Sequence, residues 1–254
     1  MDNLAPPFPA LFQTLATAAA ILAGGAMGSF LCVCVRRVPR GISVISPPSA
    51  CETCGKPVPF YLNIPVAGFL FCAGRCRDCG EKIPLLYPAL ETLCALAAFA
   101  AVKWGGGFSL DGLGCFIFLY ALIAASAFDL TTMTVPDFIT VPFAVAGIAL
   151  SIPADSFTRA VSGGAVGGGV LLAAALAYRA VRKRDGMGMG DVKLMTGAGV
   201  FTGAEGALFV IFAASALGAA GGFVYLKKRG ESFSRPFPFA PFIAASAVFF
   251  FFAS

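Results

Sequence analysis

Residues 9–35 read PALFQTLATAAAILAGGAMGSFLCVCV, a run of 27 positions without a charged side chain. A helix needs roughly 20 apolar residues to cross the hydrocarbon core of a bilayer. This run therefore predicts a membrane-spanning helix at the start of the fold. The first basic residue, Arg36, follows the run. Because a secretory signal begins with a basic stretch and has a shorter apolar core, we expect this helix to be retained.

The rest of the chain has the composition of a membrane protein. Of its 254 residues, 58% are hydrophobic and 12% are charged, and the mean hydropathy is +0.86. Soluble domains carry about 25% charged residues, so a water-soluble globule is excluded. We expect an all-α polytopic membrane protein with about eight transmembrane helices. After the first run, the apolar segments lie at about 84–102, 112–128, 138–153, 160–180, 192–202, 206–226 and 237–253.

The basic residues lie between the apolar runs, and their distribution predicts the orientation. With eight helices, only Lys103 and Arg159 fall on one side, and the remaining basic residues fall on the other. The positive-inside rule makes the crowded side cytoplasmic and puts both termini outside. Orientation in a lipid bilayer thus accounts for the net charge of +5, and we expect no nucleic-acid partner. The crowded side holds Arg36, Arg37, Arg40, Lys56, Arg75, Arg77, Lys82, Arg179, Arg182, Lys183, Arg184, Lys193, Lys227, Lys228, Arg229 and Arg235.

A proline-rich insert at 36–83 is the only sizeable polar stretch. We expect three parts: a first helix at 1–35, this insert as a small cytoplasmic domain, and a membrane domain of about seven helices at 84–254. The insert is too small to fold around a hydrophobic core alone, so it needs a staple such as a metal or disulfides.

Two C-x-x-C pairs in the insert supply that staple. Cys51 and Cys54 form the first pair, Cys76 and Cys79 form the second, and 21 residues separate the two pairs. This spacing is typical of a zinc-ribbon-like site in which four thiolates hold one structural Zn²⁺. Disulfides and redox-active thiols are the alternatives, and a reducing cytoplasm disfavours the disulfides. Cys72 lies near enough in sequence to replace one ligand. We expect Cys32, Cys34, Cys94 and Cys115 to act as small apolar residues.

The chain has no histidine, which removes Ser-His and Cys-His catalytic pairs and His-ligated zinc proteases. Acids inside membrane segments are costly and mark functional sites. Asp129 ends the third apolar segment and Asp191 opens the sixth, so opposed helices bring both to the cytoplasmic boundary. Two carboxyls that share a site hold one proton between them, which is the arrangement of aspartic proteases. The glycines at 186, 188 and 190 allow backbone or substrate to approach Asp191.

Each acid also has a structural interpretation. Asp137, after Pro136, is typical of a helix N-cap, and Asp191 could cap its own helix. Asp129 has no such explanation, because a helix C-terminus disfavours negative charge. Glu91 is either a buried packing residue or a contact for substrate or for the zinc domain. Lys193 lies two residues after Asp191, where its charge would favour the ionised form of that acid.

Together these residues resemble the type IV prepilin leader peptidases, membrane aspartyl proteases of the GxGD type. The matching stretches follow one another through most of the chain, and a lone GxGD would be weak evidence. They are Gly28-Ser-Phe-Leu31 with Arg37-Val-Pro39, the four cysteines, Asn63-Ile-Pro65, Tyr87-Pro88 with Glu91, Asp129 through Pro136-Asp137, Gly188-Met-Gly-Asp191 with Val192-Lys193-Leu194, and Pro238-Phe-Ala-Pro241-Phe242.

The resemblance implies a bacterial inner-membrane enzyme with Asp129 and Asp191 as its catalytic pair. Its substrates would be type IV prepilins or type II secretion pseudopilins, cut on the cytoplasmic side after their short basic leader. It also implies N-methylation of the new N-terminus with S-adenosylmethionine, although the chain has no Rossmann-like glycine fingerprint.

Two other classes of protein remain open from the sequence. A membrane thiol oxidoreductase would use the C-x-x-C pairs for redox chemistry. A transporter or scaffold would use its intramembrane acids to bind ions, and would spread them through the membrane depth.

Overall fold

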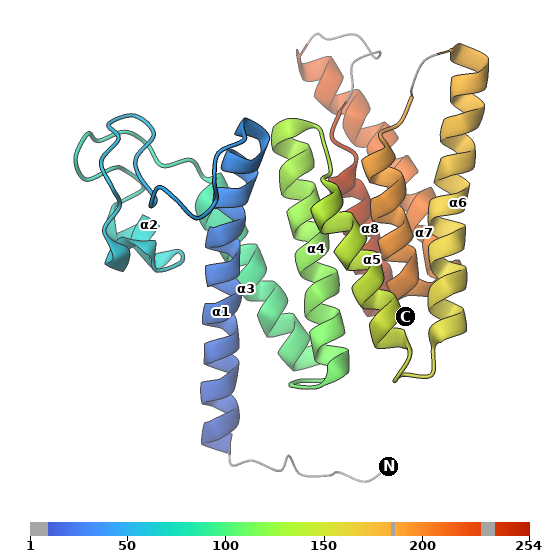
Figure 1. Cartoon of the computed structure of the whole chain (residues 1–254), viewed down its shortest axis with the longest axis horizontal. Helices are drawn as coiled ribbons and strands as arrows, with labels where there is room; N and C mark the ends of the chain where they lie inside the picture. Colours follow the sequence, from blue (N-terminus) through green and yellow to red (C-terminus); the bar gives the residue numbers. More distant parts are fainter. Residues whose placement is uncertain (1–9, 184–185, 230–236) are drawn as a thin grey trace. The chain divides into compact units, whose positions relative to one another are not determined.

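The computed structural model describes residues 10–183, 186–229 and 237–254, and over 223–229 it describes the backbone alone. These residues form helices and no strand, which confirms the all-α prediction (Figure 1). The elements are α1 (Ala10–Arg37), η1 (Val38–Arg40), η2 (Phe60–Asn63), α2 (Ala67–Phe71), α3 (Leu86–Trp104), α4 (Leu110–Thr132), α5 (Asp137–Ser151), α6 (Phe157–Arg182), α7 (Met189–Arg229) and α8 (Ala240–Ala253).

Five of the described helices are long and apolar enough to cross a membrane, and together they make this a multi-pass membrane protein. Two further apolar helices, α5 and α8, are shorter. Some basic residues expected on the cytoplasmic side are not among the described residues. These are Arg184, Arg235 and the side chains of Lys227, Lys228 and Arg229. The five long spans are Leu11–Arg40, Leu86–Trp104, Leu110–Thr132, Phe157–Arg182 and Met189–Gly222.

The chain forms two compact units, Met1–Phe116 and Ile117–Ser254, and α4 begins in the first and continues through the second. In the first unit, α1 packs along α3, and glycines of α1 lie against the α3 backbone. A Cβ at Gly28 would lie 2.7 Å from Cα of Glu91, and one at Gly24 would lie 2.6 Å from O of Cys94. Helices approach this closely in lipid only where small residues line the interface. The division predicted at 36 and 84 stays a prediction.

In the second unit, successive helices alternate in direction (Figure 1). Its centre is aromatic: the ring of Phe118 on α4 is fully buried and lies 5.4 Å from that of Phe201 and 4.6 Å from that of Phe251. The glycines of α6 face α7, where a Cβ at Gly163 would collide with O of Gly199 and one at Gly167 would lie 2.5 Å from O of Met195. These glycines therefore let the backbones of α6 and α7 pack tightly.

The helix α7 is broken at Gly203, which has φ 77° and ψ 178°. The predicted segments 192–202 and 206–226 lie on the two sides of this break, where the chain reverses direction (Figure 1). Only glycine readily adopts this conformation. The Nη2 of Arg159 donates a hydrogen bond to O of Thr202 at 3.4 Å, which satisfies a carbonyl at the end of the first half of α7.

Near the two aspartates, the helices extend beyond the predicted apolar segments. The third segment continues past Asp129 to Thr132, and the sixth begins at Met189, before Asp191. Hydropathy marks where a chain becomes polar, whereas a helix can continue through polar residues that find partners. Asp129 has such a partner, the backbone N–H of Ala240.

We expect Gly203→Ala to destabilise the protein by about 1–3 kcal/mol, because alanine does not adopt this backbone conformation readily. A Cβ there would also lie 2.8 Å from Nε of Arg159. Gly169→Ala is the matched control, since a Cβ at this helical position meets nothing within 4 Å. Thermal unfolding in detergent should show a lower Tm for Gly203→Ala and an unchanged or higher Tm for Gly169→Ala. Equal Tm values for the two variants would contradict the requirement for glycine at position 203.

Candidate active site and metal centre

Asp129 is buried near the end of α4, with 6% of its surface exposed. Its Oδ2 accepts a hydrogen bond of 2.8 Å from the backbone N–H of Ala240, the first residue of α8. A helix N-terminus has free N–H groups and a partial positive charge, so it favours a carboxylate at this position. The contact joins residues 111 positions apart. It explains how a carboxylate is accommodated near the C-terminus of α4, where the helix dipole disfavours negative charge.

Asp191 lies in the first turn of α7 and is partly buried. Asp129 lies near enough for its charge to act on the Asp191 carboxyl. The end of α4 and the starts of α7 and α8 therefore meet at one place in the second unit. The structure brings together the two carboxylates that the sequence suggests as a pair, while their catalytic role stays a prediction.

Asp137 and Lys193 form an ion pair close to this junction. The Nζ of Lys193 lies 2.6 Å from Oδ1 and 2.8 Å from Oδ2 of Asp137. The prediction that Asp137 caps α5 was wrong, because Pro136 occupies the N-cap position and no side chain caps that end. The hypothesis that Lys193 favours the charged form of Asp191 stays untested, but its ammonium is engaged by Asp137. The pair connects the start of α5 to the first turn of α7.

The three glycines before Asp191 have different surroundings. A Cβ at Gly190 would lie 2.9 Å from Cβ of Val135, so this glycine accommodates the chain segment between α4 and α5. One at Gly186 would collide with the ring of Tyr178. A Cβ at Gly188 would meet only Oδ2 of Asp191, at 3.7 Å, which is an ordinary contact. Gly188 is exposed, so the space beside the Asp191 carboxylate is open there.

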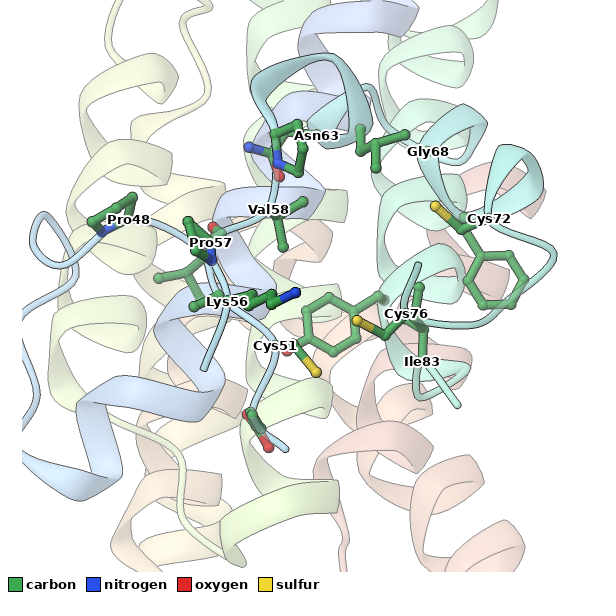
Figure 2. Close-up of a pocket in the computed structure, with 18 of the residues that line it drawn as sticks. Pro48, Cys51, Lys56, Pro57, Val58, Asn63, Gly68, Cys72, Cys76 and Ile83 are labelled. Atoms are coloured by element: carbon green, nitrogen blue, oxygen red, sulfur yellow. The ribbon is translucent and has the colours of Figure 1, made fainter. Parts of the chain in front are cut away.

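Glu91 lies in the first unit, on α3, with 8% of its surface exposed. Its Oε2 accepts a hydrogen bond of 2.6 Å from the N–H of Val66 in the insert. Val66 has φ 60°, which is unusual for a β-branched residue, so this hydrogen bond holds a strained turn against α3. Glu91 also lines a cavity of ≈ 890 Å³ between the insert and the two helices α1 and α3. Figure 2 shows other residues of its wall, among them Val58 and Cys72 of the insert.

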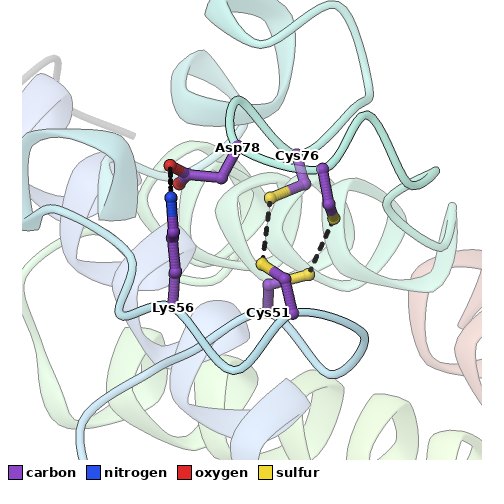
Figure 3. Close-up of polar contacts among 6 residues, drawn as sticks. Cys51, Lys56, Cys76 and Asp78 are labelled. Atoms are coloured by element: carbon purple, nitrogen blue, oxygen red, sulfur yellow. Dashed lines mark hydrogen bonds and ion pairs between the residues drawn. The ribbon is translucent and has the colours of Figure 1, made fainter.

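The four cysteines of the insert come together in space. Their Sγ atoms all lie within 4.8 Å of one another (Figure 3). The distances from Cys51 to Cys79 and from Cys54 to Cys76 are 3.7 and 4.0 Å. A tetrahedral zinc site with Zn–S bonds of about 2.3 Å places its sulfur atoms about 3.8 Å apart, whereas a disulfide requires about 2.05 Å. The donor set therefore fits one Zn²⁺ and no disulfide.

The two C-x-x-C pairs adopt the same backbone turn. In the first, N of Cys51 donates to O of Lys56 and N of Gly55 donates to O of Cys51, both at 2.9 Å. Cys76, Gly80 and Glu81 repeat this pattern at 2.8 and 2.9 Å. Gly55 and Gly80 have φ of 71° and 74°, and a Cβ at either would meet nothing within 4 Å, so backbone conformation alone requires glycine.

Polar interactions support this centre. Backbone N–H groups of Cys54 and Thr53 bond to the sulfur of Cys51 and lower the pKa of that thiol to about 6, which favours the thiolate that zinc binds. An ion pair of 2.7 Å between Lys56 and Asp78 links the two turns (Figure 3). Cys72 lies outside the cluster, in the wall of the cavity. Cys32, Cys94 and Cys115 are buried, as expected for small apolar residues, and Cys34 is half-buried.

Comparison with known proteins places these features in one family. Residues 116–223 match the model of the type IV leader peptidase family, and residues 22–104 match the bacterial peptidase A24 N-terminal domain. The chain belongs to the type IV leader peptidase family. The first match holds Asp129 and Asp191, and the second holds the four cysteines and Glu91.

Other members of the leader peptidase family are identical to this chain at about a third of the positions over most of its length. A protein of Burkholderia pseudomallei (strain 1026b) is 33% identical over 266 positions, covering 94% of this chain and 85% of the relative. One from Bacillus subtilis (strain 168) is 32% identical, covering 87% and 88%. One from Myxococcus xanthus (strain DK1622) is 33% identical, covering 88% and 67%. Each carries the name prepilin leader peptidase/N-methyltransferase. No solved structure matches the chain.

Sequence reasoning missed two features of this leader peptidase chain. The first is the hydrogen bond from the N–H of Ala240 to Asp129. Nothing in the sequence near either residue indicates this contact, apart from the Pro238-Phe-Ala-Pro241 stretch at the start of α8. The pairing of Asp137 with Lys193 joins residues 56 positions apart, and no periodicity within one helix reports it. The comparisons offer nothing in favour of a thiol oxidoreductase.

We expect purified protein to contain about one zinc per chain and Cys51→Ser or Cys76→Ser to lose it, since three thiolates hold the metal less tightly than four. Removing the metal with a chelator should then lower the Tm. Cys72→Ser is the matched control and should keep its zinc. Elemental analysis that finds equal zinc in all three variants would contradict the site.

Proposed function

We propose that this chain is a prepilin leader peptidase whose catalytic groups are Asp129 and Asp191. The observation that carries the proposal is the meeting of these two carboxylates where α4 ends and α7 and α8 begin. Family membership supports it independently, because the relatives are named for leader cleavage.

The two carboxyls share one proton and carry out hydrolysis together. The ionised carboxylate takes a proton from a water molecule, and the water oxygen attacks the scissile carbonyl carbon. The protonated carboxyl gives its proton to the carbonyl oxygen. The tetrahedral intermediate then collapses, the C–N bond breaks, and the proton taken from water passes to the leaving amine.

The surroundings of the two acids assign these roles. Asp129 accepts the Ala240 N–H at a helix N-terminus, an environment that stabilises negative charge. Asp191 has no side-chain hydrogen bond among the described residues, and it lies beside the open space at Gly188. We therefore assign the ionised state to Asp129 and the shared proton to Asp191 before substrate binds. Lys193 and Asp137 act as supporting residues, because their ion pair fixes the first turn of α7.

The substrates we propose are type IV prepilins or type II secretion pseudopilins, cut after their short basic leader. The distribution of basic residues supports a position in the bacterial inner membrane, with both termini outside and the aspartates at the cytoplasmic face. The four cysteines hold a structural zinc that stabilises the insert. The relatives' names further support N-methylation of the new N-terminus, for which S-adenosylmethionine supplies the methyl group.

We expect Asp129→Asn and Asp191→Asn each to lower the rate of leader cleavage about a thousandfold or more, because the first variant loses the general base and the second loses the general acid. The measurement is cleavage of a model prepilin in membranes, followed by product mass. Asp155→Asn is the control, since Asp155 lies in the turn between α5 and α6 and has φ 50°, which asparagine tolerates. Cleavage by either catalytic variant at the unmodified rate would refute the assignment.

Gly188 and Gly190 should respond differently to alanine. Gly190→Ala should lower stability by about 1–3 kcal/mol, because the new methyl group overlaps Val135. Gly188→Ala should leave Tm nearly unchanged and reduce kcat/KM about tenfold or more, because the methyl group occupies the open side of Asp191 where substrate must approach. Thermal unfolding and cleavage kinetics separate the two effects. If Gly188→Ala cleaves normally, substrate approaches Asp191 from elsewhere.

A further inference from the structure

The middle of the insert is apolar, unlike the parts on either side of it. Between Lys56 and Arg75 the chain reads PVPFYLNIPVAGFLFCAG, 18 residues (57–74) without a charged side chain. The run contains three prolines, and its helices η2 and α2 have only four and five residues. It therefore does not cross a membrane as one helix. Apolar segments with helices shorter than a full span are typical of re-entrant segments, which enter and leave a membrane on the same side.

Both ends of this segment lie at the four-cysteine cluster. Cys54 comes three residues before its first residue, and Cys76 comes two residues after its last. The Sγ atoms of Cys54 and Cys76 are only 4.0 Å apart. The chain therefore leaves the cluster at residue 57 and returns to it at residue 74, so the segment is a loop with a closed neck.

The middle of the loop lies against the middle of α1 and α3. A Cβ at Gly25 would lie 3.0 Å from Cβ of Pro65 and 3.9 Å from Cβ of Ala95, the central residue of the span Leu86–Trp104. Gly25 belongs to the uncharged run 9–35, and every stretch of roughly 20 residues within that run, the length that crosses the hydrocarbon core, contains it. Figure 1 accordingly shows α2 beside α1 and not beyond its end. Pro65 thus lies at the depth of the hydrocarbon core.

The backbone of the loop suits a position away from water. Non-helical backbone at membrane depth needs partners for its N–H groups. The N–H of Val66 donates to Oε2 of Glu91 at 2.6 Å. The N–H groups of Gly68, Leu70 and Cys72 donate to carbonyl oxygens within the loop at 2.9, 3.1 and 3.2 Å. Glu91 therefore supplies an acceptor at a depth where water does not, which accounts for an acid within a membrane helix.

The side chains of the loop divide between two faces. Leu62 and Phe69 belong to the wall of the cavity in the first unit. Phe60, Leu70 and Phe71 lie outside that wall and are 86%, 68% and 74% exposed. Large apolar side chains that gather on a surface mark a contact with a membrane or a partner. Because this face belongs to a loop packed against two membrane helices, it continues their lipid-facing surface.

We propose that residues 57–74 form a re-entrant loop in the bilayer, with Phe60, Leu70 and Phe71 in contact with lipid acyl chains. The four-cysteine cluster closes the neck of this loop, and the charges of Lys56 and Arg75 stay at the membrane surface on its two sides. The domain predicted at 36–83 then has a charged, metal-binding part outside the bilayer and an apolar part within it. The insert acts as a membrane anchor in addition to any role in catalysis.

Tryptophan fluorescence tests where the loop lies. Trp104 is the single tryptophan of the chain and is first replaced by Phe. Phe60→Trp, Leu70→Trp and Phe71→Trp are then made one at a time in this background. The full chain is placed in phosphatidylcholine nanodiscs with or without bromine on the acyl chains. Brominated lipid quenches a ring that it contacts, whereas acrylamide quenches a ring that water reaches.

We expect brominated lipid to reduce the emission of all three variants at least about twofold, because their rings lie in the hydrocarbon core, and acrylamide to change it little. Ile45→Trp is the matched control and should respond in the opposite way. Ile45 is 89% exposed in the same insert, and its N–H bonds to Ser43, which is held by Arg37 at the charged end of α1. A Tm equal to that of the Trp104→Phe background shows that each variant is folded.

Two results would overturn the inference. Quenching of the three rings by acrylamide and not by lipid would place them in water, and protection by an added model prepilin would then assign the surface to the substrate. Quenching by neither agent would show that protein covers them, as a second copy of the chain would.

A pair of variants at Glu91 tests its part in holding the loop. Glu91→Gln keeps an oxygen acceptor for the N–H of Val66, whereas Glu91→Leu leaves that N–H without one. In the Phe71→Trp background we expect Glu91→Leu to reduce the lipid quenching and to raise the acrylamide quenching about twofold or more, and Glu91→Gln to change neither. Equal quenching in the two variants would contradict this role of Glu91.

Discussion

The hydrogen bond from the N–H of Ala240 to Asp129 is the interaction on which the second unit depends. It places a carboxylate where three helix ends meet, and it satisfies that carboxylate with a group that any helix N-terminus has free. Inside a bilayer, helices satisfy their own backbone groups, so unpaired donors are concentrated at the ends. A catalytic acid in this environment is therefore most easily held at a helix end, and both Asp129 and Asp191 are close to one.

Close packing of the helices complements this arrangement. The glycines of α6 let its backbone contact the first half of α7, the half that carries Asp191, and this half ends at the break at Gly203. The ion pair between Asp137 and Lys193 then links the start of α5 to the same turn. The contacts with α6 and this ion pair all involve the first half of α7, which contains the second aspartate.

The first unit is organised by a different principle. Its insert is too small to form a hydrophobic core, and two similar turns bring four sulfur atoms to the separation that zinc requires. Glu91 ties the insert to α3 through Val66 and at the same time lines the cavity. A single buried carboxylate thus links the insert to the helix pair.

Sequence alone determined the features that depend on composition and local spacing. Hydropathy identified the apolar segments, the C-x-x-C spacing identified the four cysteines, and the absence of histidine left carboxylates as the best catalytic candidates. These features are local, because each depends on residues within one segment or one turn. The break at Gly203 was also visible, as a gap between two apolar segments.

Only the tertiary structure decided which groups far apart in the sequence form hydrogen bonds and ion pairs with one another. Asp137 was interpreted as a helix cap because sequence shows only near neighbours, whereas its actual partner, Lys193, lies 56 residues away. The partner of Asp129 is a backbone N–H, which every non-proline residue carries, so no residue type could have identified it. The cavity beside Glu91 is likewise a property of packed surfaces. Partner choice over long distances depends on how helices pack, and a linear pattern does not contain that information.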